Sequence, residues 1–302
     1  MLTCSIGVMA YNEEANIGYL LECLYAQRLV SCEIKDICVV ASGCTDRTEE
    51  IVRSCARRNP QVRLLVQEKR EGKASAINLF LRHAEGDIVI LESGDTLPEP
   101  DTVENLVQPF QDPMVGMTGG RPVPMNATNT FIGFTVGLYW RLHHQIALSE
   151  PKLGEMVAFR NIIHGISADT AVDEASIEAL INKAGLRIHY AGNAVVHNKG
   201  AETIRDYIKQ RRRVTAGHKH LQATCGYTVS TIKVHNLVRL VGRVLRDAGW
   251  SGRFLSWTAG AMALELYGKL LGDYDYYVKK KNPFVWDIAK STKNLRNDSS
   301  DS

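Results

Sequence analysis

Four short polar clusters lie along the N-terminal third of the chain, each starting where an apolar run ends. They read AYNEE at 10–14, ASGCTD at 41–46, REGKASAIN at 70–78 and ESGDTLPEP at 92–100. Amides, hydroxyls and carboxylates can hydrogen-bond a base and ribose, and basic and acidic residues can hold a diphosphate with its bridging metal ion. If the apolar runs are parallel strands, the clusters meet at the C-terminal edge of one sheet, where open α/β folds bind ligands. With the basic cluster QRRR at 210–213, this series predicts a nucleotide-phosphate site.

The first two clusters are candidates for contact with the base and ribose. Their candidate residues are Ala10, Tyr11, Asn12, Glu13 and Ser42. Asn12 can both donate and accept hydrogen bonds, and Glu13 can accept one from a ribose hydroxyl or a base N–H. The alternative interpretation is that Asn12 and Asp46 cap the helices that come next in the chain. The two are compatible, because a capping side chain lies at the same edge of the sheet.

The third and fourth clusters are candidates for the diphosphate and its metal ion. Arg70–Lys73 contains Gly72 and opens a predicted helix, so main-chain amides and the Lys73 ammonium suit phosphate oxygens. This segment lacks the Gly-Lys-Ser/Thr ending of a P-loop, and a solvated turn is the alternative. The carboxylate of Asp95, after Ser93 and Gly94, predicts a ligand for Mg²⁺ or Mn²⁺, which prefer oxygen donors. Alternatively, Asp95 is a turn residue before Leu97-Pro98.

Acids and arginines in the second half complete the candidate site. Asp173 or Glu174 can serve as a general base that deprotonates an acceptor hydroxyl, although acids also favour the first turn of a helix. Gln210 and Arg213 share one helix face at i, i+3, with Arg211 beside them. Arginine suits the oxygens of a departing diphosphate, and a solvated helix face is the alternative.

In order and spacing, these clusters resemble family-2 glycosyltransferases with the GT-A fold. AYNEE resembles the (A/P)-x-N-E element of that family, ASGCTDRT its D-D-G-S-T-D-x-T element, and REGKASAIN its N-x-G-K-x-x-A-x-N loop. SGDTLPEP resembles the metal-binding D-x-D-x-x-x-x-P, the pair at 173–174 resembles the catalytic E-D, and QRRRV resembles Q-x-x-R-W. The resemblance covers about residues 3–220.

The resemblance implies an inverting enzyme that transfers a sugar from a nucleotide-diphosphate donor to a hydroxyl of a sugar, lipid-linked or small-molecule acceptor. It implies Glu174 as the base, with Asp173 as the alternative, and Asp95 as the metal ligand. The chain departs from the family at four places. Ala41-Ser42 replaces an acidic pair, Ser93 replaces the first metal-motif acid, the catalytic pair is D-E, and Val214 replaces the Trp.

Two other functions compete with glycosyl transfer. A nucleotidyltransferase is also α/β with a basic loop and metal-binding acids, but its phosphate loop would lie close to the first strand, which carries AYNEE here. A nucleotide-sugar-binding protein that has lost catalysis is the third possibility, because Ser93 stands where an acid is expected.

Apolar runs that alternate with helical patterns of about a dozen residues predict a doubly wound, mostly parallel α/β sheet with flanking helices. Later helices are predicted near 130–148, 175–184, 202–221 and 231–248, with a strand near 187–196. We expect a donor-binding half at 1–125, an acceptor-binding and catalytic half at 126–222, and a C-terminal helical extension with a polar tail at 223–302.

Bulk properties bound the class of protein. Hydrophobic residues make up 45% of the 302 and charged residues 23%, as in soluble globular proteins, and a net charge of +3 argues against nucleic acid as a partner. Seven scattered cysteines without a CxxC pair favour a reducing compartment. We expect a cytoplasmic protein without a signal peptide or spanning helix. The amphipathic segments 233–246 and 254–272 suggest peripheral contact with a membrane, and their packing on the catalytic domain is the alternative.

Overall fold

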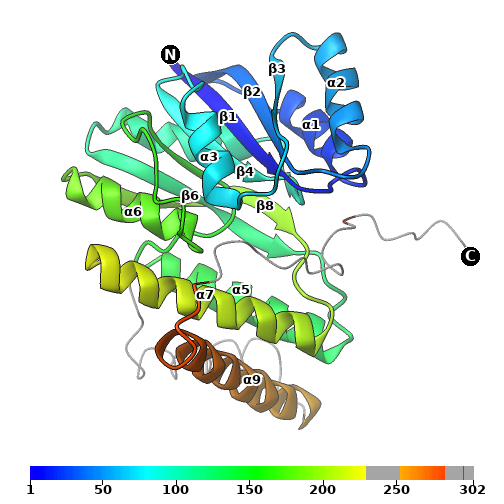
Figure 1. The fold of residues 1–302 in the computed structure, drawn as a ribbon, viewed down its shortest axis with the longest axis vertical. Helices are drawn as coiled ribbons and strands as arrows, with labels where there is room; N and C mark the ends of the chain where they lie inside the picture. Colours follow the sequence, from blue (N-terminus) through cyan, green and yellow to red (C-terminus); the bar gives the residue numbers. More distant parts are fainter. Residues whose placement is uncertain (229–251, 283–294, 296–302) are drawn as a thin grey trace, which may run out of the picture.

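One mixed sheet forms the centre of the molecule (Figure 1). The computed structural model describes residues 1–228, 252–282 and 295. Within them, the strands of an 8-stranded sheet follow the order β3-β2-β1-β4-β7-β6-β8-β5. The strands are β1 Leu2–Ala10, β2 Cys32–Ser42, β3 Val62–Gln67, β4 Ile88–Ser93, β5 Thr96–Pro98, β6 Val115–Pro124, β7 Val157–Arg160 and β8 Arg187–Asn198.

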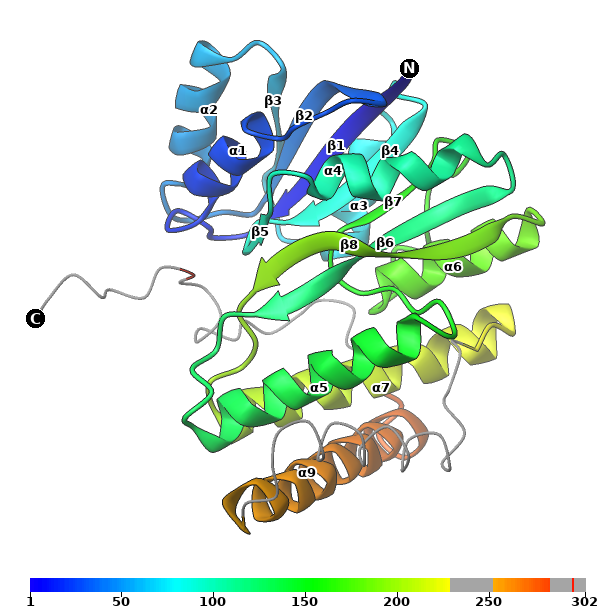
Figure 2. The same cartoon turned by 180° about the vertical axis from the view of Figure 1, so that it is seen from behind.

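Helices cover both faces of this sheet and form a further layer below it. They are α1 Ile17–Tyr25, α2 Thr48–Arg58, α3 Lys73–Leu81, α4 Thr102–Val107, α5 Phe131–Ala147, α6 Asp173–Lys183, α7 Ile204–Cys225 and α9 Gly252–Tyr277, with a 3-10 turn η1 Gln108–Gln111. Because strand side chains alternate between faces, Ile6 and Val8 of β1 pack with α1, α2 and α4, whereas Met9 packs with α3 and α6. Figures 1 and 2 show these two helix layers on opposite sides of the strands.

The parallel part of the sheet brings the predicted clusters to one edge. β1 pairs in parallel with β2 and β4, and β2 pairs in parallel with β3. In the other half, β6 and β8 are parallel, whereas β7 is antiparallel to β4 and β6, and β5 is antiparallel to β8. The predicted α/β class with flanking helices is confirmed. The sequence did not predict β5, β6 or β7, and their antiparallel pairings make the sheet mixed.

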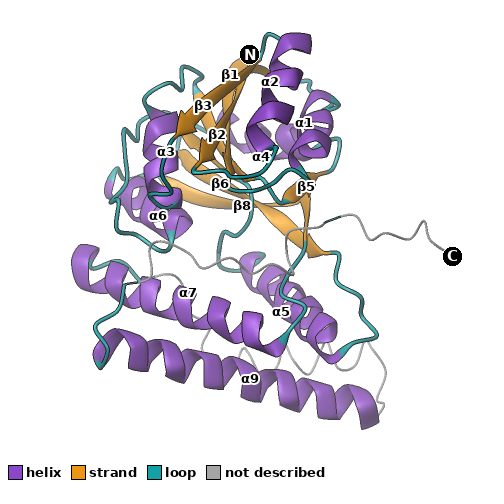
Figure 3. Ribbon diagram, turned by 45° about the vertical axis from the view of Figure 1, so that its right-hand side comes forward, coloured by secondary structure: helices purple, strands orange, loops and turns teal. Residues whose placement is uncertain are grey.

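A separate layer of three helices, α5, α7 and α9, lies below the sheet (Figure 3). Helix α9 packs closely on α7, because a Cβ on Gly272 would lie only 2.6 Å from the Cβ of Thr215. Arg212 of α7 also donates two hydrogen bonds, of 2.7 and 2.8 Å, to the carboxylate of Asp275 of α9. Among the described residues, no helix combines the length and hydropathy needed to cross a membrane. The predicted helix 231–248 lies outside the described residues.

Core packing at Gly7 of β1 generates a stability prediction. A Cβ on Gly7 would lie 2.3 Å from the ring of Phe80, which is fully buried and cannot move aside. Gly7→Ala should therefore destabilise the protein by about 1–3 kcal/mol through overpacking. Gly18→Ala in α1 is the matched control, because its Cβ would meet Ile51 at an ordinary 3.5 Å. That change should be neutral or stabilise by up to about 1 kcal/mol. Urea unfolding of both variants measures the difference, and a Gly7→Ala protein as stable as the wild type would contradict it.

Candidate active site

Asn12 and Asp46 tie the loops after β1 and β2 together. The Asn12 side-chain amide donates to Thr45 Oγ1 at 3.1 Å and its oxygen accepts from the Thr45 amide at 2.8 Å, with Asn12 at a left-handed φ of 53°. Asp46 accepts from the main-chain amides of Glu14 and Thr48, each at 3.0 Å. The capping interpretation is therefore wrong for Asn12, since α1 starts five residues later at Ile17. For α2 the N-cap position is Arg47, and Asp46, one residue earlier, accepts the hydrogen bond from the amide of Thr48, the first residue of the helix.

Glu13 lies beneath these loops rather than on their open face. Its carboxylate is buried and accepts from the Asn16 side-chain amide at 3.1 Å, and its main-chain amide donates to Thr48 Oγ1 at 2.8 Å. Its stem packs so tightly against Gly94 that a Cβ there would lie 2.7 Å from Glu13 Cγ. Glu13 thereby joins the loop after β1 to the loop after β4.

This edge also carries an aromatic ring and, buried at the end of β2, one hydroxyl without a partner among the described residues. The Arg70 guanidinium lies 4.0 Å from the centroid of the Tyr11 ring, a cation–π distance. The buried Ser42 hydroxyl has no hydrogen-bond partner within the described part of the chain. Ala10, the last residue of β1, is buried beneath them. A planar, polar group such as a base has both stacking and hydrogen-bonding partners here.

The Lys73 side chain bridges both candidate bases. Its Nζ lies 2.7 Å from Asp173 Oδ2 and 3.1 Å from Glu174 Oε1. The exposed fractions of the side chains are 15% for Lys73, 3% for Asp173 and 29% for Glu174. Although burial opposes it, the negative charges of Asp173, Glu174 and Glu155 raise the pKa of Lys73, which is therefore a stable cation. The structure brings together residues that the sequence assigned to separate subsites.

The two acids at the start of α6 have different surroundings. Burial and the neighbouring Asp173 raise the pKa of Glu174, while the Lys73 ammonium lowers it. Asp173 Oδ1 is buried without a hydrogen-bond partner in the described ranges. Glu174 is the more accessible of the two, and a raised pKa suits a group that must take a proton near neutral pH.

Two further acids, Glu92 and Glu155, lie close to Asp95, and neither was among the predicted site residues. Glu92, the penultimate residue of β4, is 2% exposed, and burial raises the pKa of its carboxyl well above the ordinary value. Glu155 directly precedes Met156, which has a left-handed φ of 49°. Burial, together with Glu174, Asp95 and Asp173, raises the pKa of Glu155 to about 7, although Lys73 opposes the shift. No sequence pattern marks Glu155, because it stands before an apolar run instead of after one.

The donor set around Asp95 fits a metal ion that takes most of its ligands from elsewhere. The Asp95 carboxylate is half-buried and makes no hydrogen bond or ion pair with the described residues. In residues 1–228, 252–282 and 295, no three His, Cys, Asp or Glu side chains are grouped as metal ligands. Mg²⁺ commonly uses one or two carboxylates and completes its shell with water and phosphate oxygens, which is compatible with Asp95 alone. Ser93 and Gly94 shape this turn, with the Gly94 amide donating to Met9 O at 3.0 Å.

The arginines of α7 lie in two different surroundings. Arg213 interacts with the charges of Asp173, Glu174 and Glu155, and burial lowers its pKa to about 10. Arg211 instead lies against α5 and α9, with its guanidinium 4.5 Å from the Tyr139 ring centroid and 3.7 Å from Glu265 Oε1. Gln210 is half-buried on the same helix. Arg213 is thus the member of the cluster that faces the candidate bases.

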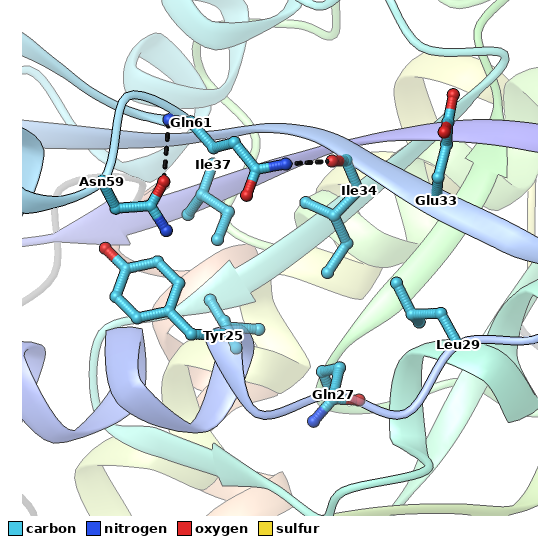
Figure 4. Close-up of a pocket in the computed structure, with 9 residues that line it drawn as sticks. Tyr25, Gln27, Leu29, Glu33, Ile34, Ile37, Asn59 and Gln61 are labelled. Atoms are coloured by element: carbon cyan, nitrogen blue, oxygen red, sulfur yellow. Dashed lines mark hydrogen bonds between the residues drawn. The ribbon is translucent and has the colours of Figure 1, made fainter.

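A cavity of about 300 Å³ lies at the opposite edge of the sheet (Figure 4). Gln61 lines this cavity. Its main-chain amide donates to the Asn59 side-chain oxygen at 2.9 Å, and its side-chain amide donates to the Ile34 carbonyl at 2.7 Å. Ile34 and Gln61 lie at the start of β2 and just before β3, so the cavity is separate from the candidate site at the strand C-terminal ends.

The fold, with the polar loops gathered at the C-terminal ends of β1, β2 and β4, is of the GT-A type, and comparisons with known proteins agree. Residues 5–157 match the model of glycosyl transferase family 2, and residues 88–271 match that of glycosyl transferase family group 2. The chain belongs to glycosyl transferase family 2. Similar folds include a mannosyltransferase from Pyrobaculum calidifontis, in complex with GDP-Man and Mn²⁺, at TM-score 0.64 and 22% identity over 92% of this chain and 88% of that one.

Glucosyl-3-phosphoglycerate synthase from Mycobacterium tuberculosis, in complex with Mn²⁺, UDP and phosphoglyceric acid, has a similar fold at TM-score 0.51 and 21% identity, over 76% of this chain and 80% of that one. Poly-β-1,6-N-acetyl-D-glucosamine synthase of Staphylococcus aureus is 25% identical over 70% of this chain and 53% of its own length. A dolichyl-phosphate β-glucosyltransferase of Trichomonas vaginalis is 35% identical over 33% of this chain and 31% of its own length. The chain spans about half or less of the length of these two relatives.

The raised pKa of Glu155 predicts a pH-dependent stability difference. Between its ordinary value of 4.5 and the folded value of about 7, the folded protein keeps a proton that the unfolded chain releases. This group therefore makes the protein less stable as pH rises through that window, by up to about 3 kcal/mol. Glu155→Gln should be more stabilising at pH 8 than at pH 5, measured by urea unfolding. Glu22→Gln, on the exposed side of α1, should show no such dependence. Equal effects of Glu155→Gln at both pH values would contradict the assignment.

Proposed function

We propose that the protein is an inverting, metal-dependent glycosyltransferase that moves a sugar from a nucleotide-diphosphate donor to an acceptor hydroxyl. The observation that carries the proposal is the convergence of Lys73 with Asp173 and Glu174 at the strand edge that also holds Asp95. Membership of glycosyl transferase family 2 supports it.

The donor lies across the loops after β1, β2 and β4 in this proposal. Tyr11 and Arg70 stack on the base, and Asn12 and Glu13 hold the loops that form its pocket. The N-terminus of α3 and the Lys73 ammonium receive the diphosphate. Asp95 would hold the Mg²⁺ or Mn²⁺ ion, and that ion would supply positive charge to the departing diphosphate.

The acceptor reaches the same point from the side of α5, α6 and α7. Glu174, or Asp173 as the alternative, takes the proton of the acceptor hydroxyl as its oxygen attacks the anomeric carbon. The bond between that carbon and the diphosphate oxygen breaks, and its electrons leave with the diphosphate. Arg213, which interacts with Asp173 and Glu174, supplies positive charge for the departing diphosphate. We therefore keep the proposed division into a donor half at 1–125 and an acceptor half at 126–222.

The alternatives differ from this proposal in measurable ways. A nucleotidyltransferase would release pyrophosphate, whereas a glycosyltransferase releases a nucleoside diphosphate. A binding protein without catalysis would bind the nucleotide and release nothing, even to water. The dolichyl-phosphate relative makes a lipid-linked acceptor the first to test, beside sugar and small-molecule acceptors.

Paired variants test the assigned roles. Glu174→Gln should lower turnover of UDP- and GDP-sugars, to water or to an acceptor, by about 10²–10⁴ with nearly unchanged donor affinity. Asp95→Ala should instead lose the Mn²⁺-dependent rise in melting temperature that UDP or GDP produces, because ligand binding stabilises the native state. Wild-type turnover in Glu174→Gln would move the base to Asp173 or elsewhere, and unchanged metal-dependent binding in Asp95→Ala would overturn the metal assignment.

We also propose that α9 carries the protein to the cytoplasmic face of a membrane. The acids of α9 are engaged with α7. Glu265 accepts from the Tyr207 hydroxyl at 2.9 Å, Asp275 pairs with Arg212, and Asp273 lies 3.8 Å from Lys219. The outer face is left with apolar side chains that are 41–60% exposed, namely Leu255, Met262, Leu266, Tyr267, Leu270 and Tyr274. Exposed Lys279–Lys281 lie just beyond its end. An apolar face that is flanked by basic residues, on a helix whose acids are paired with α7, suits an anionic lipid surface.

Flotation with vesicles of phosphatidylcholine and phosphatidylserine tests this surface. The wild-type protein should float with the vesicles at low salt, and the double variant Leu266→Glu/Leu270→Glu should not. Val30→Glu/Met114→Glu, which changes two exposed apolar residues far from α9 in sequence, is the control and should still float. A wild-type protein that stays in solution would contradict the proposal, and a dimer dissociated by the α9 changes would assign the face to a second copy.

A further inference from the structure

We propose that Lys73 couples donor binding to release of the catalytic base. Its ammonium contacts the carboxylates of Asp173 and Glu174, and the donor diphosphate draws the ammonium away so that the base becomes available. The inference rests on the proposed function, because it takes Lys73 as a diphosphate contact and Glu174 as the base.

The contacts of Lys73 define the closed arrangement. Lys73 begins α3 and Glu174 lies 101 positions later in the first turn of α6, and both helices cover the same face of the sheet. One ammonium contacts two carboxylates at 2.7 and 3.1 Å, using two of its three N–H donors. A carboxylate held in this way is a poorer base, because taking a proton would break a charge-assisted hydrogen bond.

The same position favours an incoming diphosphate. Gly72, with φ at 98°, turns the chain into the nine-residue helix α3, and the N-terminal end of a helix favours an anion. A diphosphate at this helix end would lie within reach of the flexible four-carbon stem of Lys73. Phosphate oxygens and the two carboxylates would then compete for the Lys73 ammonium. Hydrogen bonds from Lys73 to phosphate would weaken its hydrogen bonds to Asp173 and Glu174.

The remaining charged neighbours of Glu174 determine how its proton affinity changes when Lys73 moves. They are Asp173 and Glu178 on α6, Glu155 before β7 and Arg213 on α7. Once Lys73 has shifted toward phosphate, the acids around Glu174 favour its protonated form, and Arg213 only partly opposes them. Glu174 becomes a stronger base once the donor is in place, so the acceptor is activated only after donor binding.

Proton linkage measures this coupling without catalysis. We would titrate UDP and GDP with Mg²⁺ into the protein at pH 7 by calorimetry, in two buffers that differ in ionisation enthalpy. The wild type should take up a few tenths of a proton more than Glu174→Gln does, because its base gains proton affinity on binding. Proton release from the terminal phosphate of the nucleotide lowers the measured uptake, and it does so equally in both proteins.

Variants separate the alternatives. Glu155→Gln should keep the difference, which excludes Glu155 as its source, and Lys73→Met should bind more weakly and lose it. If Glu174→Gln does not fold, Glu174→Ala serves in its place, because it also removes the titrating carboxylate. Equal proton uptake by the wild type and Glu174→Gln would overturn the coupling while leaving the proposed function intact. Failure of the wild type to bind either nucleotide would count against the proposed function itself.

Discussion

The arrangement of the candidate site depends on the parallel pairing of β1 with β2 on one side and β4 on the other. This pairing is stable because both faces of β1 are buried, with Ile6 and Val8 against one helix layer and Met9 against the other. Since parallel strands end at the same edge, the loops after all three strands meet. Hydrogen bonds of Asn12, Asp46 and the Glu13 amide lock the loops after β1 and β2 to one another, and the loop after β4 packs on Glu13 through Gly94.

The second constraint is electrostatic. Five acids, Glu92, Asp95, Glu155, Asp173 and Glu174, lie near one another at a partly buried edge of the sheet. Burial, together with neighbouring carboxylates, raises the pKa of Glu92, Glu155 and Glu174. Lys73 and Arg213 supply positive charge, and Glu92 and Glu155 hold their protons more strongly than usual. Such a cluster lowers the stability of the folded state, but its protonation responds to any charged ligand. Two phosphates with a metal ion would change which acids are protonated and which ion pairs form.

Helix α9 has two roles that come from opposite faces. Its inner face holds Arg211 and Arg212 of α7 through Glu265 and Asp275, which leaves Arg213 to face the acids. Its outer face is apolar over several turns. In the proposed function, the helix that orders the arginines also carries the enzyme to the surface where a lipid-linked acceptor resides, so attachment and acceptor access depend on one element.

Local periodicity in the sequence by itself determined the alternating strands and helices of the N-terminal third and, later in the chain, α5, α6, β8 and α7. It did so because buried strands and amphipathic helices repeat their apolar residues at fixed spacing. It also indicated the edge where the polar clusters meet. Only the tertiary structure decided which side chains touch. Glu155 was missed because β7 is antiparallel to β4, so the residues before β7, not those after it, lie at the edge. The contact between Lys73 and Glu174, 101 positions apart, likewise depends on how α3 and α6 pack on one face, and no local pattern encodes that packing.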